Sequence, residues 1–317
     1  MRKMRALLVG NGVNRLGRSG EGKSWEEVLR HLASFARMPG DERFRGKPFP
    51  LVFEAVFNHI LSFDPEFKET ALKNKVACLV GGFPVNAYHK ALVRLPAEHI
   101  LTTNYDDCLE RALPPEIPTA KPISTTPPPK TKNFSLGLGY EFAGRRIWHI
   151  HGERKFPNTI MLGHDHCAGC ATALRGALII PRNDKTDAQY YAERLKRKRT
   201  VERLDRWIDV FLTADVDIVG FEFDLTESVL WWLLQFRDKC RRMREREHSL
   251  EIGAIRFHDI HGPQPRSQAQ EDRNDLLKWF GAEVITYPSQ DWLRSYDQFI
   301  SEFSPSGAAQ VNRIDQR

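Results

Sequence analysis

Residues 5–14 read Arg-Ala-Leu-Leu-Val-Gly-Asn-Gly-Val-Asn. The apolar run at the start of this segment is typical of a short buried strand. The Gly-Asn-Gly that follows allows a tight turn at the carboxyl end of that strand. A helix is then predicted from Ser24, which can cap it together with Glu27, and whose apolar residues recur at helical spacing. This strand, turn and helix predict an α/β fold.

Short apolar segments alternate with helical patterns along the rest of the chain. Strands are predicted over residues 99–103, 140–142, 146–150, 160–162, 217–220, 252–257 and 283–287, with a hairpin turn at Gly144. Helices are predicted over residues 51–61, 65–78, 86–95, 201–212, 225–246 and 292–303, and another begins near Asp106 or Asp107. Residues 275–280 are predicted to be the end of a further helix. Such alternation is typical of a parallel sheet that is covered on both faces. We therefore predict a Rossmann-like parallel sheet with helices on both faces, and we expect ligands at the carboxyl ends of its strands.

The predicted organisation is one domain over residues 1–303, followed by a flexible tail over residues 304–317. The domain contains a small, mainly helical insert at about residues 25–95. Residues 113–130 hold seven prolines. Because proline lacks the amide donor of a strand ladder, this segment is expected to be an extended surface loop.

Composition excludes several classes of protein. The longest strongly apolar stretch, residues 229–236, is much too short to cross a bilayer, and the basic start is followed by too short an apolar run for a signal peptide. Five cysteines without a secretory signal favour free thiols in a reducing cytosol, so we expect a cytoplasmic protein without membrane contact.

The positive charge gives only weak information about partners. The chain has 47 Lys and Arg against 41 Asp and Glu, a net charge of +6, and the excess gathers in residues 194–203 and 237–247. These segments are either solvated helix ends favoured by the macrodipole or a patch for an acidic partner or a nucleic acid. Contact with nucleic acid is only weakly supported, because no zinc-finger spacing or aromatic-basic sheet motif accompanies the charge.

The Gly-rich turn after the first strand has two interpretations. Gly10 and Gly12 could let backbone amides approach a phosphate, or they could serve a tight turn alone. The dinucleotide fingerprint is not met, because Arg15 stands where its third glycine belongs. An ordinary dehydrogenase is therefore disfavoured, and the loose glycine spacing of residues 17–24 does not make a P-loop.

Polar residues also follow two later strands. Asn104 and Asp106 offer an amide and an acid to a ribose or a water, or they cap the next helix. His149 and His151 are expected on one side of their strand by alternation. A strand-terminal histidine followed by glycine is well placed as a general base.

Together these motifs resemble the sirtuin fold. Gly10-Asn-Gly-Val-Asn14, Thr102-Thr-Asn-Tyr-Asp106, His151-Gly152 and Val219-Gly-Phe221 occur in the order and setting of that family. The chain looks most like the bacterial branch of sirtuin-like NAD hydrolases that act in anti-phage defence. The motifs span residues 8–235, about three quarters of the chain.

The resemblance implies a role for each matching residue. Asn104, His151 and Asp106 are the implied catalytic residues: Asn104 positions the ribose hydroxyls and a water, Asp106 orients the ribose and the nicotinamide end, and His151 is the base. The implied NAD-binding residues are Gly10, Asn11, Gly12, Asn14, Thr103, Gly220 and Glu222.

Two departures argue against a protein deacylase. Deacetylating sirtuins carry a Gly-x-Pro-Asp-Phe-Arg segment after the first loop, and it is missing here. They also carry two Cys-x-x-Cys pairs that hold a structural zinc, whereas this chain has one, Cys167 to Cys170, preceded by His164 and His166. No metal is therefore expected.

The function that the resemblance implies is cleavage of NAD, as substrate, to nicotinamide and ADP-ribose, with depletion of NAD as the defence. Because a constantly active NADase would kill its host, control is expected from assembly, either as a homo-oligomer or with a partner such as a HerA-type ATPase. An NAD- or ADP-ribose-binding sensor without turnover is the alternative, and an NAD-dependent protein deacylase is a further one.

Overall fold

A mixed sheet of eight strands organises the protein in the computed structural model. The structure describes residues 4–16, 23–39, 44, 46–117, 121–122, 136–179, 191, 204, 206–247, 252–262, 264–287 and 291–303. Within these residues the strands are β1 (Arg5–Val9), β2 (His99–Thr102), β3 (Lys121–Pro122), β4 (Gly139–Phe142), β5 (Arg145–His149), β6 (Asp215–Val219), β7 (Ile255–Asp259) and β8 (Ala282–Thr286). Their order is β3-β4-β5-β2-β1-β6-β7-β8.

The strands from β5 to β8 in that order are parallel, and only β3 and β4 run antiparallel to their neighbours. The α-helices are α1 (Trp25–Phe35), α2 (Phe49–Leu61), α3 (Glu69–Gly81), α4 (Ala87–Leu92), α5 (Cys108–Arg111), α6 (His164–Leu178), α8 (Trp207–Thr213), α9 (Ser228–Glu247), α10 (Gln268–Trp279) and α11 (Trp292–Phe303), with 3-10 turns η1 (Asn11–Arg15) and η3 (Pro157–Thr159). The predicted α/β fold with a largely parallel sheet is confirmed.

Helices cover both faces of the sheet, and the alternation of side chains along β1 shows how. Ala6 and Leu8 pack into a core with α6, α8, α9 and α10, whereas Leu7 and Val9 pack into a second core with α4, α5 and α11. All four side chains are fully buried. A strand that is buried on both faces is an unbroken apolar run, which is the pattern in the sequence.

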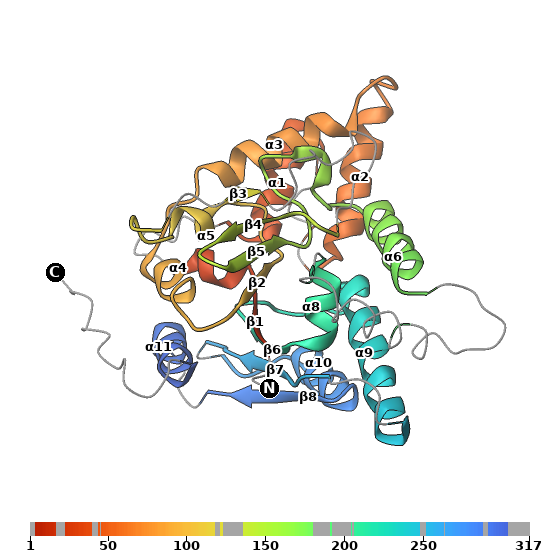
Figure 1. The fold of residues 1–317 in the computed structure, drawn as a ribbon. Helices are drawn as coiled ribbons and strands as arrows, with labels where there is room; N and C mark the ends of the chain where they lie inside the picture. The colour runs from red at the N-terminus through yellow and green to blue at the C-terminus, as the bar shows by residue number, and fades with distance from the viewer. Residues whose placement is uncertain are drawn as a thin grey trace.

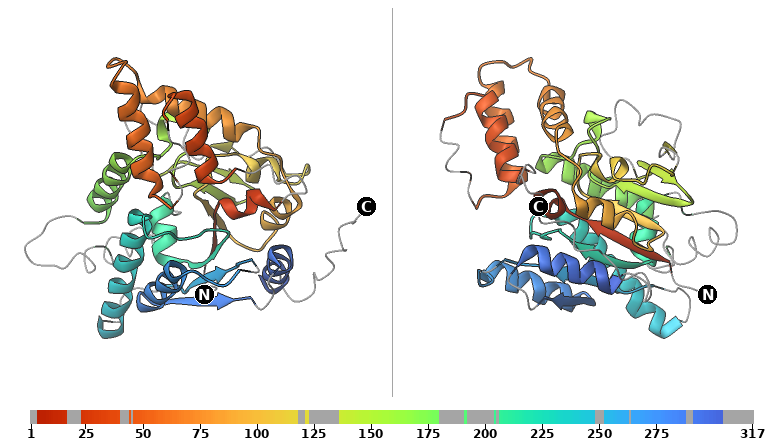
Figure 2. Two further views of the ribbon diagram at one scale, coloured as in Figure 1. Left: turned by 180° about the vertical axis from the view of Figure 1, so that it is seen from behind. Right: turned by 90° about the vertical axis from the view of Figure 1, so that its left-hand side faces the viewer.

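Helices α1, α2 and α3 form a third core that stands apart from the sheet (Figure 1). The capping box predicted for the first helix is present, with the Ser24 hydroxyl accepting from the Glu27 amide and the Glu27 carboxylate accepting from the Ser24 amide. Tyr105 and Ile160 join this core from the loops after β2 and β5. The three helices therefore pack against the segments that carry the strand ends, while the C-terminal helices α10 and α11 lie at the opposite end of the molecule (Figure 2).

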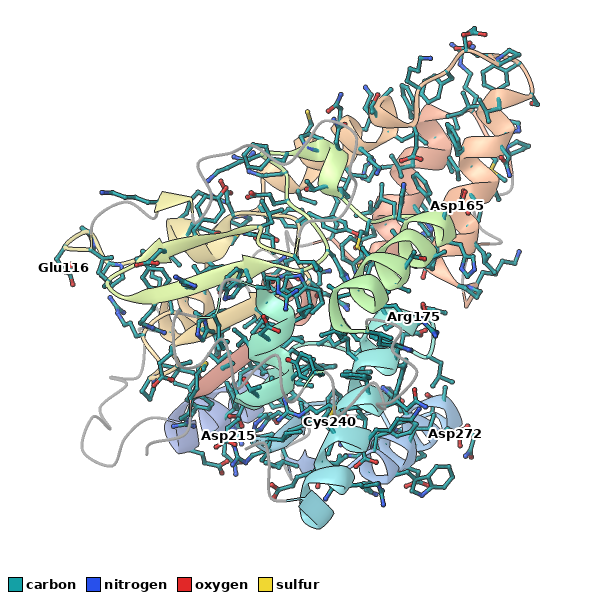
Figure 3. The ribbon with its side chains drawn as sticks, turned by 45° about the vertical axis from the view of Figure 1, so that its right-hand side comes forward. Glu116, Asp165, Arg175, Asp215, Cys240 and Asp272 are labelled. Carbon is teal, nitrogen blue, oxygen red and sulfur yellow. The ribbon has the colours of Figure 1, made fainter. Side chains whose placement is uncertain are left out.

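Helix α6 connects these two parts. It packs against α2 on one side and α9 on the other. Figure 3 labels Asp165 near its first turn and Arg175 near its last, both on the exposed side. Cys170, Leu174 and Leu178 enter the core of the sheet from its buried side.

Several predicted boundaries were wrong. Residues 160–162 are buried but belong to no strand, because the segment makes a single sheet-like contact, from the Met161 amide to the His151 carbonyl at 3.0 Å. Helix α3 begins at Glu69 rather than at residue 65, and α9 begins at Ser228 rather than at residue 225. The proline-rich segment contributes β3, which lies at the edge of the sheet. Proline is tolerated there because an edge strand does not need every amide as a donor, so the missing N–H of Pro122 disrupts no ladder. Three predicted segments fall outside the described residues: residues 118–120 and 123–130 of the proline-rich segment, the basic run 194–203, and the tail 304–317.

Two further observations concern the membrane spans and the cysteines of the protein. No helix among the described residues is both long and apolar enough to cross a membrane. All five cysteines are free thiols, and Cys108, Cys170 and Cys240 are buried.

Candidate active site

A cleft of about 3330 Å³ opens at the carboxyl ends of β1, β2, β5 and β6. Its walls come from these strand ends, from α1 and the loops around α2 to α4, and from the segments that carry α10 and α11. The predicted site residues that line it are Asn11, Gly12, Thr103, His151, Gly220 and Glu222. The other four, Gly10, Asn14, Asn104 and Asp106, are not among the residues that line the cleft.

Gly10 and Gly12 are required by the approach of β6 to β1. A Cβ at Gly10 would lie 2.4 Å from the Gly220 carbonyl oxygen, and one at Gly12 would lie 2.8 Å from the same atom. The Gly10 amide donates to the Val219 carbonyl at 3.0 Å, and the Gly12 amide donates to the Gly220 carbonyl at 2.7 Å. Both glycines therefore serve the turn, and their two amides are already bonded within the protein.

Asn104 is buried directly behind Gly10. Its side-chain Nδ2 donates to the Gly10 carbonyl at 3.2 Å, and its backbone amide donates to the Thr102 hydroxyl at 3.1 Å. Its Oδ1 is buried and has no hydrogen-bond partner among the described residues. A buried acceptor without a partner costs free energy, and such groups in folded proteins are commonly explained by a missing ligand or water.

Asn14 and Asp106 belong to a buried polar chain. Asn14 Nδ2 donates to Asp106 Oδ2 and to Asn11 Oδ1, both at 2.8 Å, and Asn14 Oδ1 lies 2.8 Å from His89 Nε2. His89 Nδ1 accepts from the Asn86 amide, so Nε2 carries the proton and donates to Asn14. Burial lowers the pKa of His89 to about 4, which keeps the ring neutral. This series of hydrogen-bonded side chains thus fixes Asn11 at the wall of the cleft.

Asp106 has little capacity left for a ligand. Its Oδ2 accepts from Asn14, and its Oδ1 accepts from the Cys108 amide at 2.9 Å, as a carboxylate at the start of α5. Asp106 therefore holds both Asn14 and the first amide of α5, whereas the N-cap position of that helix is occupied by Asp107, which makes no side-chain cap bond.

His151 and His149 have different environments, contrary to the prediction from alternation. Strand β5 ends at His149, so the alternation does not extend to His151. His149 is fully buried, with Nδ1 at 3.1 Å from the Asn104 carbonyl oxygen and Nε2 at 2.8 Å from Glu110 Oε1. Both partner atoms accept only, so both ring nitrogens carry protons. Burial alone would lower the pKa of His149, but Glu110 and Glu153 raise it to about 9.

His151, in contrast, reaches the cleft. Its Nε2 lies 3.7 Å from Glu227 Oε2, and burial lowers the pKa of His151 to about 4. At neutral pH the imidazole is therefore uncharged and able to accept a proton, as a general base requires. Gly152, which follows it, has φ +89° and a Cβ there would lie 2.1 Å from the Thr159 carbonyl oxygen, so the turn that presents His151 requires glycine.

Glu222 lies on the cleft beside Gly220. Arg273 donates from Nη1 to the Glu222 carbonyl and from Nη2 to Asp259 Oδ1, both at 2.8 Å. These bonds fix the backbone of Glu222 between the ends of β6 and β7 and leave its carboxylate exposed on the cleft. Thr103 and Gly220 complete the strand ends, and Phe221 and Phe223 form part of the wall.

The cysteine pair in α6 does not form a metal centre in the structure. His166 Nδ1 accepts from the Gly163 amide at 2.8 Å, and its Nε2 bonds Glu69 at 2.7 Å, so neither nitrogen has a lone pair to give a metal. Within the described residues no group of three or more His, Cys, Asp and Glu side chains could hold a metal ion. Cys167 instead lines the cleft, and Cys170 is buried in the core.

Sequence reasoning missed two participants in this region. His89 is separated from Asn14 by 75 residues, so only the folded chain brings them together. Glu227 directly precedes α9, where an acidic residue is ordinary for a helix N-terminus. Its proximity to His151 has no counterpart in the local sequence pattern.

A comparison with models of protein families gives a match within this region. A family model described as the SIR2-like domain matches residues 98–224, from the start of β2 to the loop after β6. This range includes Asn104, Asp106, His151 and Gly220, whereas Gly10 to Asn14 precede it. The comparison with curated proteins found no match. Over these residues, which are less than half of the chain, the protein is similar to the SIR2-like domain, and its α/β sheet is consistent with that likeness.

Proposed function

We propose that this protein is an NAD glycohydrolase that cleaves NAD to nicotinamide and ADP-ribose. The observation that carries the proposal is the buried Oδ1 of Asn104, which has no hydrogen-bond partner in the described part of the chain. Asn104 follows β2, the neighbour of the strand that precedes His151, and both residues lie in the range that matches the SIR2-like domain. An amide oxygen can accept a hydrogen bond from a ribose hydroxyl or from water. A neutral imidazole can take the proton that such a water loses.

In the proposed reaction, the oxygen of a water forms a bond to the anomeric carbon of the nicotinamide ribose. The bond from that carbon to the ring nitrogen breaks, and its electron pair stays on nicotinamide, which leaves uncharged. The water gives one proton to His151. Asn104 orients the ribose hydroxyls and the water, and this orientation lowers the entropic part of the barrier.

The other predicted residues have supporting roles in this proposal. Asp106 acts through Asn14, which in turn holds Asn11 on the cleft wall. Gly10, Gly12 and Gly220 allow β1 and β6 to meet closely enough to form the floor for NAD. Thr103 and Glu222 are proposed to contact the dinucleotide at the strand ends. No metal takes part.

The proposed setting is bacterial anti-phage defence in the cytoplasm, in which NAD depletion follows activation by self-association or by a partner such as a HerA-type ATPase. This setting rests on the likeness of the motifs to the defence branch. Size-exclusion chromatography of the chain, alone and with the product of a neighbouring gene, tests it against NAD loss in the same fractions. A monomer that hydrolyses NAD at full rate would contradict control by assembly.

The hydrolase is tested by following NAD, nicotinamide and ADP-ribose together. Equal amounts of nicotinamide and ADP-ribose, formed as NAD disappears, are expected. NAD that binds in calorimetry but is never cleaved would instead support a sensor. Release of nicotinamide only in the presence of an acylated peptide would support a deacylase.

A further inference from the structure

The segment after β6 holds a carboxyl group over the cleft by local bonds. Gly220 and Phe223 both have positive φ, +64° and +53°, so the chain turns sharply as it leaves the sheet. Asp224 then closes a short turn, because its Oδ1 accepts from the Thr226 amide at 2.7 Å and its carbonyl accepts from the Glu227 amide at 2.9 Å. A non-glycine residue at positive φ is uncommon and costs free energy, which the surrounding structure has to offset.

A second contact fixes this turn to α9. The Asp224 carbonyl also accepts from the Trp231 indole nitrogen at 3.0 Å, and the Trp231 ring packs against Phe223 with ring centres 4.6 Å apart. These contacts join the turn to α9, and Glu227 lies between them, one residue before the helix begins. The turn and the helix together fix the position of Glu227 at the cleft.

Glu227 and His151 form a pair with unequal access to water. Glu227 Oε2 lies 3.7 Å from His151 Nε2, and the two side chains are 26% and 12% exposed respectively. The Glu227 side chain is therefore the more exposed of the two. A proton held by His151 has a nearby acceptor that itself meets water.

We propose that Glu227 is a positioning residue that acts through His151. Glu227 receives the proton that His151 takes up during hydrolysis and passes that proton to solvent. The inference rests on the proposed hydrolase function and assigns the proton route of that reaction. The water's O–H bond breaks as its oxygen bonds to the ribose carbon, and the proton makes His151 an imidazolium. The imidazolium then gives its Nε2 proton to Glu227 Oε2, and Glu227 loses that proton to water.

The surroundings of the pair support a role in proton transfer. Tyr105 from the loop after β2 and Cys167 from α6 line the same cleft as Glu227 and interact with it electrostatically, and Asp224 lies on its own segment. Burial, together with Asp224, raises the pKa of Glu227 to about 8. A carboxyl group whose pKa lies near neutrality can both accept and release a proton at ordinary pH. Above about pH 8 it is ionised and ready to accept the proton from His151.

Two variants test this route by turnover. Glu227→Gln keeps the shape of the side chain and cannot accept a proton, so kcat for nicotinamide release is expected to fall about tenfold or more while KM changes less than about twofold. Glu227→Ala is expected to be rescued by added formate in proportion to its concentration, because formate can enter the vacated space and accept the proton. His151→Ala is not expected to be rescued in this way.

The pH profile and a matched control complete the kinetic test. Wild-type kcat is expected to rise with pH through about 8, as Glu227 ionises, and the Glu227→Gln profile is expected to lack this rise. Glu26→Gln removes one negative charge from the same cleft, where Glu26 pairs with Arg30 at 2.6 Å, and is expected to leave the profile unchanged. An active wild type with an unchanged Glu227→Gln profile and no formate rescue would overturn the proton route while leaving the hydrolase intact.

A second measurement does not depend on turnover. The ring carbon signal of His151 in an NMR titration is expected to shift in a step centred near pH 8 as Glu227 ionises, and Glu227→Gln is expected to lose that step. A wild-type His151 signal without a step near pH 8 would overturn the pairing whether or not NAD is cleaved. A wild type that releases no nicotinamide while its His151 signal keeps this step would count against the hydrolase, and not against the contact.

Discussion

Asn104 donates its side-chain amide to the carbonyl oxygen of Gly10 at 3.2 Å, and this bond fixes the direction of its Oδ1, which has no partner among the residues that the structure describes. The bond joins the ends of the two central strands, β2 and β1. It also explains why a residue that does not itself line the cleft can belong to the site. The Asn104 backbone is held separately, by the Thr102 hydroxyl and by the His149 ring. The amide is thus preorganised before any ligand arrives.

Gly10→Ala is expected to destabilise the protein strongly, whereas Gly176→Ala is expected to stabilise it slightly. A methyl group at Gly10 would overlap the Gly220 carbonyl at 2.4 Å, and backbone cannot move away cheaply at the junction of β1 and β6. Gly176 lies inside α6 with open space around its Cβ position, so alanine there favours the helix by about 1 kcal/mol. Urea unfolding of the two variants measures both signs, and a Gly10→Ala variant as stable as wild type would contradict the close approach.

Stability is expected to fall as the pH decreases from about 6.5 to 4, partly because of His89. The folded pKa of His89 is lowered to about 4 by burial, so between these values the unfolded chain binds a proton that the folded chain does not. The contribution is therefore present above pH 6.5 and lost as the pH falls. His89→Asn is expected to weaken the dependence in pH-resolved unfolding experiments. The substitution His31→Asn at an exposed histidine serves as the control. An equal change of the pH dependence in both variants would contradict the contribution of buried His89.

Glu110→Gln is expected to destabilise the protein and to alter its alkaline stability. Glu110 is the acceptor for His149, and removing one partner of a buried charged pair typically costs about 3 kcal/mol or more. The folded pKa of His149 is raised to about 9, so its contribution is present below pH 6.5 and is lost as the pH rises through 9. The variant should lose this alkaline dependence. Unchanged unfolding curves between pH 7 and 10 would show that the pair contributes nothing.

Local sequence patterns predicted the elements that form by local rules. The apolar run of β1, the capping box at Ser24 and the hairpin at Gly144 depend on residues that are neighbours in the chain. The strand ends followed from the same logic, because parallel strands gather their carboxyl ends at one edge. Asn104 and His151 were predicted at strand ends in this way, and each lies two residues beyond its strand, β2 and β5 respectively, while their roles stay predictions.

The remaining features depend on distant contacts. The apolar segment at residues 160–162 has the composition of a strand but joins no strand ladder among the described residues. Ile160 and Leu162 pack into the core of α1 to α3, and Met161 packs into the core of the sheet. His89 reaches Asn14, and Glu227 reaches His151, across 75 and 76 residues of chain respectively. The glycines at positions 10 and 12 have two sequence interpretations, and only the position of β6 shows which contact excludes a side chain.

The central claim is that Asn104 and His151 cleave NAD and do not merely bind it. The most direct measurement is nicotinamide release by wild type, Asn104→Ala and His151→Ala, with NAD affinity of each determined by calorimetry. The exposed Asn58→Ala and His31→Ala serve as matched controls. We expect wild type and both controls to release nicotinamide, and the two site variants to remain folded, to bind NAD and to lose at least about 100-fold in rate. Undiminished release by either site variant, or a wild type that neither binds nor cleaves NAD, would contradict the account.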